Sequence, residues 1–284
     1  MVLGNCTVVT TLLSWTGVDT HGPASIYIAS DSRISWGISN TWDVGRKVFS
    51  SKKRPEIFGY CGSVFFPIQF LGQLIELIDS EMFFLDEEPF SEKLEKVRLA
   101  IEKSYNNLPI SQKGSCRILY ASRVGLKMRS FFHVGEIKIS ATAVTSKEIA
   151  LQEQSGIIVS AGSGKTSLRK WHEEWVGLPN KDPYQSGRTS RSVFSAFCDS
   201  LTAKDDPFSG GAPQLVGLYR NGPANNFGII HNNKPFLNGL EVADVNLMNN
   251  IEWRNSLFER CCGDSMQIFK KAKRQPKLNG IKQP

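Results

Sequence analysis

Residues 8–33 have the sequence VVTTLLSWTGVDTHGPASIYIASDSR, in which two apolar, β-branched stretches flank a run of turn residues. Residues 8–15 have the composition of a buried strand, and residues 25–30 alternate between apolar and polar side chains. Residues 16–23 contain the Gly, Asp and Pro that are typical of turns. The stretch therefore predicts a β-hairpin with a long loop, and Asp31 follows its second strand.

The rest of the chain continues with strands, and two groups of helices lie between them. Further strands are predicted at residues 47–49, 56–60, 116–123, 127–134, 139–144, 157–160, 215–220 and 227–231. Apolar residues at helical spacing predict helices over residues 65–84, 91–105 and 192–201, and another helix beginning at Gly164. This order indicates stacked layers, whereas residues 171–187 and 234–284 show no clear pattern.

The formal charge of +7 is concentrated near the end of the chain. The basic residues there are Lys270, Lys271, Lys273, Arg274, Lys277 and Lys282. No aromatic residues alternate with them, as they do in segments that bind single-stranded nucleic acid. We therefore expect a solvated tail and no nucleic-acid partner.

The cysteines and the first residues indicate the compartment. The six cysteines contain no CxxC pair, and the four histidines are isolated, so neither a metal site nor a cofactor is expected. Residues 1–15 lack the basic and apolar regions of a signal peptide, and no segment is apolar for long enough to cross a membrane. These features predict a soluble cytoplasmic protein with reduced thiols and no membrane partner.

Short motifs of reactive residues and glycines follow one another along the chain. They are Thr10-Thr11, Asp31-Ser32-Arg33, Lys47, Gly162-Ser163-Gly164 and Asp206-Pro207-Phe208-Ser209-Gly210-Gly211. A threonine hydroxyl needs a base to become a nucleophile, and an N-terminal threonine can use its own α-amine, whose pKa is roughly 8. A buried lysine nearby supplies positive charge, and an aspartate beside it keeps the lysine charged and oriented.

In order and spacing these motifs resemble the active site of N-terminal nucleophile (Ntn) hydrolases of the proteasome β-subunit and HslV type. The resemblance covers residues 10–231 and includes the step of 16 residues from Asp31 to Lys47. It implies that Thr10 is the nucleophile and that Lys47 and Asp31 form the ion pair beside it.

The resemblance also assigns the remaining site residues. It implies that Ser163, Asp206 and Ser209 surround the threonine amine, and that the backbone N–H of Gly62 stabilises the oxyanion. The positions that line the substrate pocket in the family are occupied here by Ile34, Phe49 and Tyr60. Their side chains imply a preference for apolar substrate residues.

The implied fold is α+β, a four-layer αββα sandwich of two antiparallel sheets between helix pairs. The implied organisation is a leader or incorrectly assigned start (1–9), a proteasome-like hydrolase domain (10–235) and a C-terminal extension with a basic tail (236–284). Family leaders are cut autocatalytically, usually after a glycine, whereas Val9 precedes Thr10 here. Cys6 and Thr7 are the alternative nucleophiles.

We therefore expect a threonine-type peptidase or amide hydrolase that acts on peptide or protein substrates. The family implies self-assembly, often with an ATPase partner. Two alternatives keep the fold: an amidohydrolase for small amides, and a catalytically silent structural subunit. The third is a nucleotide-binding module at residues 162–166, GSGKT, which has the least support because a P-loop requires a glycine where Val159 stands.

Overall fold

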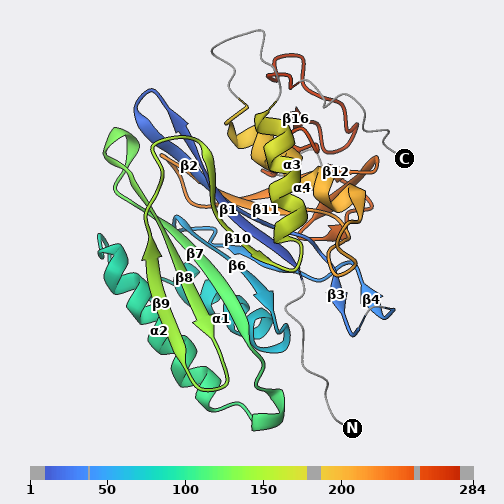
Figure 1. Cartoon of the computed structure of the whole chain (residues 1–284). Coiled ribbons are helices and arrows are strands. Elements are labelled where there is room, and N and C mark those ends of the chain that lie inside the picture. The colour runs from blue at the N-terminus through green and yellow to red at the C-terminus, as the bar shows by residue number, and fades with distance from the viewer. Residues whose placement is uncertain (1–9, 38, 178–186, 246–249, 276–284) are drawn as a thin grey trace.

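The structure is a computed structural model that describes residues 10–37, 39–177, 187–245 and 250–275 (Figure 1). In this part of the chain, helices and predominantly antiparallel sheets form a mixed α/β fold. The α-helices are α1 (Phe65–Asp79), α2 (Phe90–Asn106), α3 (Lys165–Val176) and α4 (Ser190–Ala203).

The larger sheet has nine strands. Seven of them are hydrogen-bonded in the order β10 (Gly156–Gly162), β1 (Thr11–Asp19), β2 (Gly22–Ser30), β11 (Gln214–Tyr219), β12 (Asn225–His231), β13 (Lys234–Leu237) and β14 (Leu240–Glu241). β15 (Glu252–Arg254) pairs in parallel with β12, and β16 (Arg260–Cys261) pairs with β15.

The second sheet has five antiparallel strands in chain order. They are β5 (Val48–Ser50), β6 (Glu56–Gly62), β7 (Cys116–Val124), β8 (Phe131–Ile139) and β9 (Val144–Ile149). A small hairpin of β3 (Ile34–Ser35) and β4 (Thr41–Trp42) projects from the body of the molecule (Figure 1).

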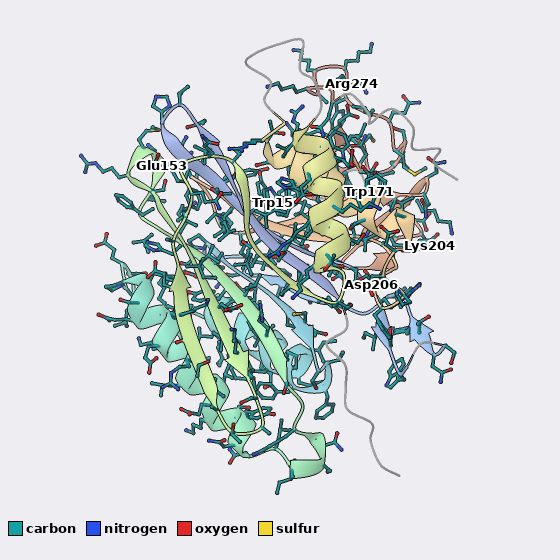
Figure 2. All side chains as sticks on the ribbon, in the orientation of Figure 1. Trp15, Glu153, Trp171, Lys204, Asp206 and Arg274 are labelled. Atoms are coloured by element: carbon teal, nitrogen blue, oxygen red, sulfur yellow. The ribbon has the colours of Figure 1, made fainter. Side chains whose placement is uncertain are left out.

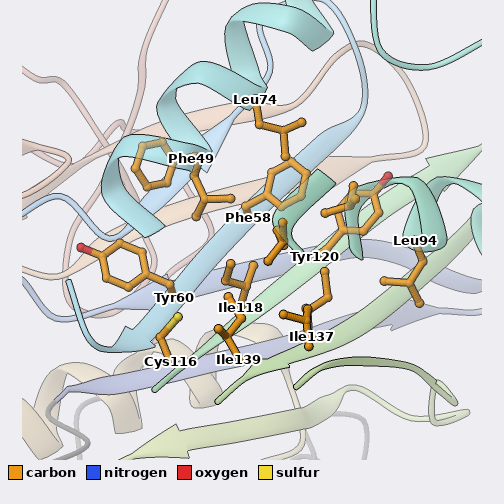
Figure 3. Close-up of a cluster of buried hydrophobic side chains, with 14 of the residues drawn as sticks. Phe49, Phe58, Tyr60, Leu74, Leu94, Cys116, Ile118, Tyr120, Ile137 and Ile139 are labelled. Carbon is orange, nitrogen blue, oxygen red and sulfur yellow. The ribbon is translucent and has the colours of Figure 1, made fainter. Parts of the chain in front are cut away.

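One apolar cluster holds α1 and α2 on the five-stranded sheet (Figure 3). Within it Phe58 of β6 stacks on Tyr120 of β7 with ring centroids 4.6 Å apart. Leu74 of α1 and Leu94 of α2 belong to the same cluster. Burial of apolar surface is the main favourable term in folding, so this cluster fixes the helix pair on its sheet.

Two further clusters complete the core. α3 and α4 pack on the nine-stranded sheet through residues that include Trp15 of β1 (Figure 2) and Phe194 of α4, whose ring centroids are 6.2 Å apart. A third cluster combines residues of both sheets, among them Ile28 of β2 and Leu119 of β7, each 0% exposed. The two sheets therefore share a dry interface.

The prediction of a long loop in the first hairpin is wrong. β1 and β2 continue through most of residues 16–23 and leave a turn at Thr20 and His21. A β-bulge between Gly17 and Val18 absorbs the irregular sequence, and the backbone N–H of His21 donates to Oδ1 of Asp19 at 2.8 Å. The turn-forming residues were assigned to one loop because a bulge inside a strand contains the same residue types.

Two other predicted elements differ from those in the structure. The strand predicted at residues 139–144 does not form: its ends belong to β8 and β9, and residues 140–143 make the turn between them, closed by the backbone N–H of Ser140, which donates to the carbonyl of Ala143 at 2.9 Å. The helix predicted over residues 65–84 ends as α1 at Asp79, because Glu81 adopts a left-handed φ of 60°. Phe84, which extended the apolar pattern, is buried from the following loop.

The C-terminal part without a sequence pattern contributes strands to the larger sheet. The predicted boundary at residue 235 falls within β13. The parallel pair β12–β15 places Trp253 against Gly228, where an added Cβ would meet the indole ring at 2.3 Å. No helix within the described ranges is both long and apolar enough to cross a membrane.

Candidate active site

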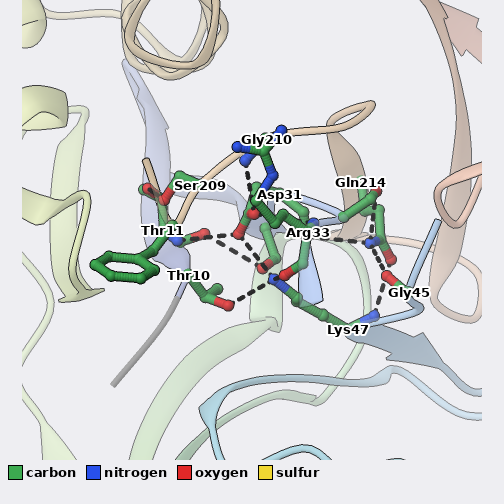
Figure 4. A network of polar contacts seen from close by, with 12 residues as sticks. Thr10, Thr11, Asp31, Arg33, Gly45, Lys47, Ser209, Gly210 and Gln214 are labelled. Carbon is green, nitrogen blue, oxygen red and sulfur yellow. Dashed lines mark hydrogen bonds and ion pairs between the residues drawn. The ribbon is translucent and has the colours of Figure 1, made fainter. Parts of the chain in front are cut away.

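The amino end of β1 lies beside the ends of three other strands of the larger sheet (Figure 4). Thr11 stands opposite Gly162 of β10, while Leu12 and Gln214 both stand opposite Ser30 of β2. This antiparallel register brings residues from distant parts of the chain into contact. The predicted motifs therefore meet at these strand ends.

The side chain of Lys47 lies among the residues at these strand ends and contacts Thr10 (Figure 4). Its Nζ donates hydrogen bonds to Oγ1 of Thr10 at 2.5 Å, to Oδ1 of Asp31 at 3.0 Å, and to the carbonyl of Arg33. Lys47 is 1% exposed and Asp31 is 0% exposed, so the pair is shielded from water. Each of the three ammonium protons has an acceptor, and one acceptor is the threonine hydroxyl.

Burial lowers the pKa of Lys47, because removal of the ammonium from water disfavours its charged form. The charge of Asp31 and the hydrogen bond to it oppose this effect. In surroundings of low dielectric constant, the remaining positive charge acts more strongly on Oγ1 of Thr10 than it would in water. The site can therefore stabilise negative charge that develops on the threonine oxygen.

Backbone amides from three segments hold the carboxylate of Asp31 in one orientation. Oδ1 accepts the N–H of Thr11, and Oδ2 accepts the N–H groups of Arg33 and Gly210, all at 3.0 Å. The carbonyl of Thr11 in turn accepts the N–H of Asp31 at 3.3 Å. Since these donors belong to the backbone, they fix the direction in which Oδ1 meets Lys47.

Ser163, Asp206 and Ser209 form a second polar group beside β1. Asp206 lies in the loop after α4 (Figure 2), and its Oδ2 accepts hydrogen bonds from both serine hydroxyls at 2.6 Å. Oγ of Ser209 lies 2.8 Å from Oγ1 of Thr11. The group thus contacts the residue after Thr10, and its predicted contact with the Thr10 amine stays a prediction.

Gly162 and Gly164 make room for the start of β1. A Cβ at Gly162 would lie 1.8 Å from the carbonyl oxygen of Thr10, and a Cβ at Gly164 would lie 1.9 Å from Oγ1 of Thr11. The N–H of Gly164 donates to the carbonyl of Thr10 at 3.5 Å. The Gly-Ser-Gly motif is therefore packed against β1, and the N–H of Gly164 is bonded to protein rather than turned toward a phosphate.

Thr10 has an unusual backbone conformation. Its φ is 111°, a value that β-branched residues rarely adopt. Strain of this kind persists where the surroundings hold it, and here Lys47 holds the side chain while Gly164 holds the carbonyl.

Gln214 is a site residue that the sequence did not reveal. Its Nε2 lies within hydrogen-bond distance of the carbonyl oxygens of Asp31 (3.2 Å) and Gly45 (2.7 Å) and of Oγ of Ser32 (2.9 Å). Its Oε1 accepts the backbone N–H of Lys47 at 3.0 Å. The only signal was one polar residue at the start of the apolar strand QLVGLY, which does not indicate a role.

Arg33 ties the small hairpin to the loop that carries Asp206. Its Nε and Nη2 donate to the two carboxylate oxygens of Asp43 at 2.7 and 2.8 Å, and its Nη1 donates to the carbonyl of Pro207 at 3.0 Å. These hydrogen bonds lower the pKa of Asp43. The sequence included Arg33 in a motif but did not predict the partner carboxylate.

The predicted oxyanion and pocket residues are buried, and their contacts are with other parts of the core. Gly62 ends β6 opposite Cys116 with a φ of 99°, and no hydrogen bond within the described ranges joins it to Thr10. Phe49 and Tyr60 belong to the apolar cluster under α1, and Ile34 is also buried. The roles of these residues stay predictions.

Two expectations concern residues outside the described ranges. The leader, residues 1–9, and the alternative nucleophiles Cys6 and Thr7 all lie there.

In the described ranges, no group of three or more His, Cys, Asp or Glu residues is arranged to hold a metal ion.

Comparison with protein-family models gives no match, and comparison with curated proteins gives none either. Among solved structures, the chain is similar to the eukaryotic HslV from Trypanosoma brucei. The two are 14% identical, the match covers 73% of this chain and 99% of the other, and the TM-score is 0.43.

Proposed function

We propose that this protein is an N-terminal-threonine hydrolase of the proteasome β-subunit type that cleaves peptide bonds with the freed Thr10. The observation that carries the proposal is the hydrogen bond of 2.5 Å from Nζ of Lys47 to Oγ1 of Thr10, made while Lys47 is held by the buried Asp31. A positive charge held beside a hydroxyl favours its deprotonated form, which is the stronger nucleophile.

In the proposed reaction, Oγ of Thr10 attacks the carbonyl carbon of the scissile bond. The free α-amine of Thr10 takes the hydroxyl proton, directly or through a water, and later gives it to the leaving amine. The C–N bond breaks, the acyl group remains as an ester on Thr10, and water then hydrolyses the ester. Lys47 stabilises the negative charge on the oxygen, and the N–H of Gly62 is assigned to the oxyanion.

The strained backbone of Thr10 supports removal of the residues before it. The torsion φ is the rotation about the N–Cα bond of Thr10 relative to the carbonyl carbon of the preceding residue, so cleavage between Val9 and Thr10 would remove the constraint that φ 111° represents. We assign this cleavage to Thr10 itself: its Oγ attacks the carbonyl carbon of Val9, the C–N bond between Val9 and Thr10 breaks as the hydroxyl proton passes to the nitrogen, and water then hydrolyses the resulting ester. The new amine would then come within the reach of Ser163, Asp206 and Ser209.

The proposal includes the finer expectations drawn from the family resemblance. They are a four-layer αββα arrangement of the sheets and helix pairs, a cytoplasmic location, assembly into a homo-oligomer, and an ATPase that delivers protein substrates. The three apolar clusters support the layered arrangement, since one joins the two sheets and each of the others joins a sheet to its own helices.

The proposal is tested by the intact mass and N-terminal sequence of the protein expressed from Met1. We expect a species that begins at Thr10, absent in Thr10→Ala and present in the control Thr41→Ala, which changes an exposed threonine of β4. The processed protein should cleave fluorogenic peptides with apolar residues before the scissile bond.

Other results would select the alternatives. A species that begins at Cys6 or Thr7 would move the nucleophile. Hydrolysis of small amides without peptide cleavage would identify an amidohydrolase. A chain that keeps residues 1–9, and that stays inactive when made to begin at Thr10, would overturn the proposal in favour of a silent subunit.

A further inference from the structure

The turn between β7 and β8 presents a basic and apolar surface, which we call the basic tip. Leu126, Met128 and Phe131 are 63%, 62% and 67% exposed, which is unusual for large apolar side chains gathered in six residues. Lys127 and Arg129 stand between them, also exposed, and take part in no ion pair among the described residues.

The loop between α1 and α2 presents the opposite charge, and we call it the acidic loop. Met82 and Leu85 are 71% and 70% exposed. Glu81, Asp86 and Glu87 are exposed beside them, and within the described ranges only Asp86 has an ion-pair partner. The acidic loop therefore repeats the pattern of the basic tip, exposed apolar side chains among charges, with the sign reversed.

The segments that carry the two surfaces are linked to one another at the end of β6 away from Gly62. Arg54, in the turn between β5 and β6, pairs with Asp86 of the acidic loop at 2.6 Å. The next residue, Pro55, accepts the backbone N–H of Arg123, just before the basic tip, at 3.2 Å. Phe90 stacks on His133 with ring centroids 4.9 Å apart. Both surfaces appear at the left of Figure 1, at the amino end of α2 and at the end of the β7–β8 hairpin.

We infer that this end of the protein binds a second copy of the chain through a two-fold symmetric contact. In such a contact each residue meets a different residue of the partner, and the partner residue meets the first in return. Rotation about an axis between the two surfaces sets each basic tip on the acidic loop of the other copy. The exposed apolar side chains then cover one another, and the opposite charges fix the register.

The charge pattern favours a second copy over an anionic membrane. Lys127 and Arg129 would be attracted to anionic lipid, whereas the exposed Glu81 and Glu87 of the acidic loop would be repelled by it. A self-complementary contact uses both signs. The inference is independent of the proposed catalytic activity, because none of these residues belongs to the candidate active site.

The test uses paired charge reversals and analytical ultracentrifugation of the full chain. In one variant Lys127→Glu and Arg129→Glu reverse the basic tip, and in the other Glu81→Lys and Glu87→Lys reverse the acidic loop and leave the Arg54–Asp86 pair intact. Each variant alone should have half the assembly mass of the wild-type protein. Mixing the two should restore the full mass, because each reversed tip then meets a reversed loop.

The control variant carries Lys165→Glu and Arg169→Glu, the same charge change on exposed residues of α3, and should keep the wild-type mass. Far-UV circular dichroism establishes that each variant is folded. Three results would overturn the inference: a monomeric wild-type protein at tens of micromolar, full mass in either reversed variant, or no recovery on mixing. Flotation of the wild-type protein with phosphatidylglycerol vesicles, lost on reversal of the tip alone, would indicate a membrane contact instead.

Discussion

Two lysine–carboxylate pairs in the described part of the protein are almost fully buried, and they differ in what surrounds them. Nζ of Lys47 lies 3.0 Å from Asp31 at the strand ends of the larger sheet, and Nζ of Lys93 lies 2.7 Å from Glu56 between α2 and the smaller sheet. Burial and ion-pair distance are thus nearly the same. Lys47 also donates to the hydroxyl of Thr10.

The surroundings of the second pair are those of a structural contact. Oε2 of Glu56 accepts the hydroxyl of Tyr120 at 2.6 Å, and Lys93 lies over the ring of Phe84 at 5.2 Å from its centroid. Burial raises the pKa of Glu56, and the charge of Lys93 opposes that rise. The comparison teaches that burial of a charged pair does not identify a reactive site. A third group that can change chemically does.

The largest expected effect separates the two pairs by activity. Lys47→Met should lower kcat/KM for a peptide substrate by roughly a thousandfold, since it removes the charge that stabilises the reacting oxygen. Lys93→Met should leave kcat/KM within about twofold while destabilising the protein by about 3–5 kcal/mol, because Glu56 loses its partner. Steady-state kinetics and urea denaturation of both variants measure the contrast. Equal losses of activity would remove the functional distinction between the pairs.

How far the sequence predicts this distinction depends on the residue. Lys47 and Asp31 were assigned from their spacing within an ordered set of motifs, and the structure brings them together with Thr10. Lys93 and Glu56 gave no signal, because a lysine on an amphipathic helix is ordinarily a solvated residue. Gln214 was missed for a related reason, since three of its four contacts are to backbone atoms whose positions follow from the folded register.

The fold was predictable where periodicity was strong and unpredictable where pairing was remote. The α2 and α4 helices and the β6 and β12 strands follow apolar patterns, whereas β15 depends on Trp253 packing over Gly228 of a distant strand. The first hairpin loop was overestimated because the bulge at Gly17 resembles a turn in composition. Local patterns specify elements, and long-range contacts decide how far each element extends.

The second prediction tests whether Gln214 makes the Lys47 pair catalytically competent. Gln214→Leu removes the acceptor of the Lys47 N–H and leaves buried backbone oxygens without a donor, which should destabilise the protein by about 2 kcal/mol. We expect kcat to fall about tenfold with little change in KM, because the lysine loses its fixed position. The matched control is Gln73→Leu on the exposed face of α1. Loss of stability without a change in kcat would limit Gln214 to a structural role.

The third prediction concerns the alkaline limb of the pH profile. Because burial lowers the pKa of Lys47, its ammonium should lose its proton at a lower pH than an ordinary lysine, whose pKa is about 10.4. The charge favours the reaction, so kcat/KM should fall as pH rises through the lowered pKa, by about tenfold per pH unit beyond it. Lys93→Met should leave this limb in place. A profile that stays flat to pH 10.4 would contradict the assignment of the positive charge to Lys47.

The smallest expected effect comes from replacing the structural pair as a whole. Glu56→Gln with Lys93→Met removes both charges, keeps an acceptor for the hydroxyl of Tyr120, and should change the free energy of unfolding by only about 1 kcal/mol. In Lys93→Met alone, Glu56 has a raised pKa without its partner, so stability should be greatest at low pH and decline as pH rises through that raised value. The double variant should lose this dependence of stability on pH, because residue 56 no longer has a carboxyl group that can titrate. If the double variant proved as unstable as the single one at neutral pH, the Lys93–Glu56 pair would itself be essential to the fold. The difference between the two buried pairs would then concern what each lysine supports rather than whether it is needed.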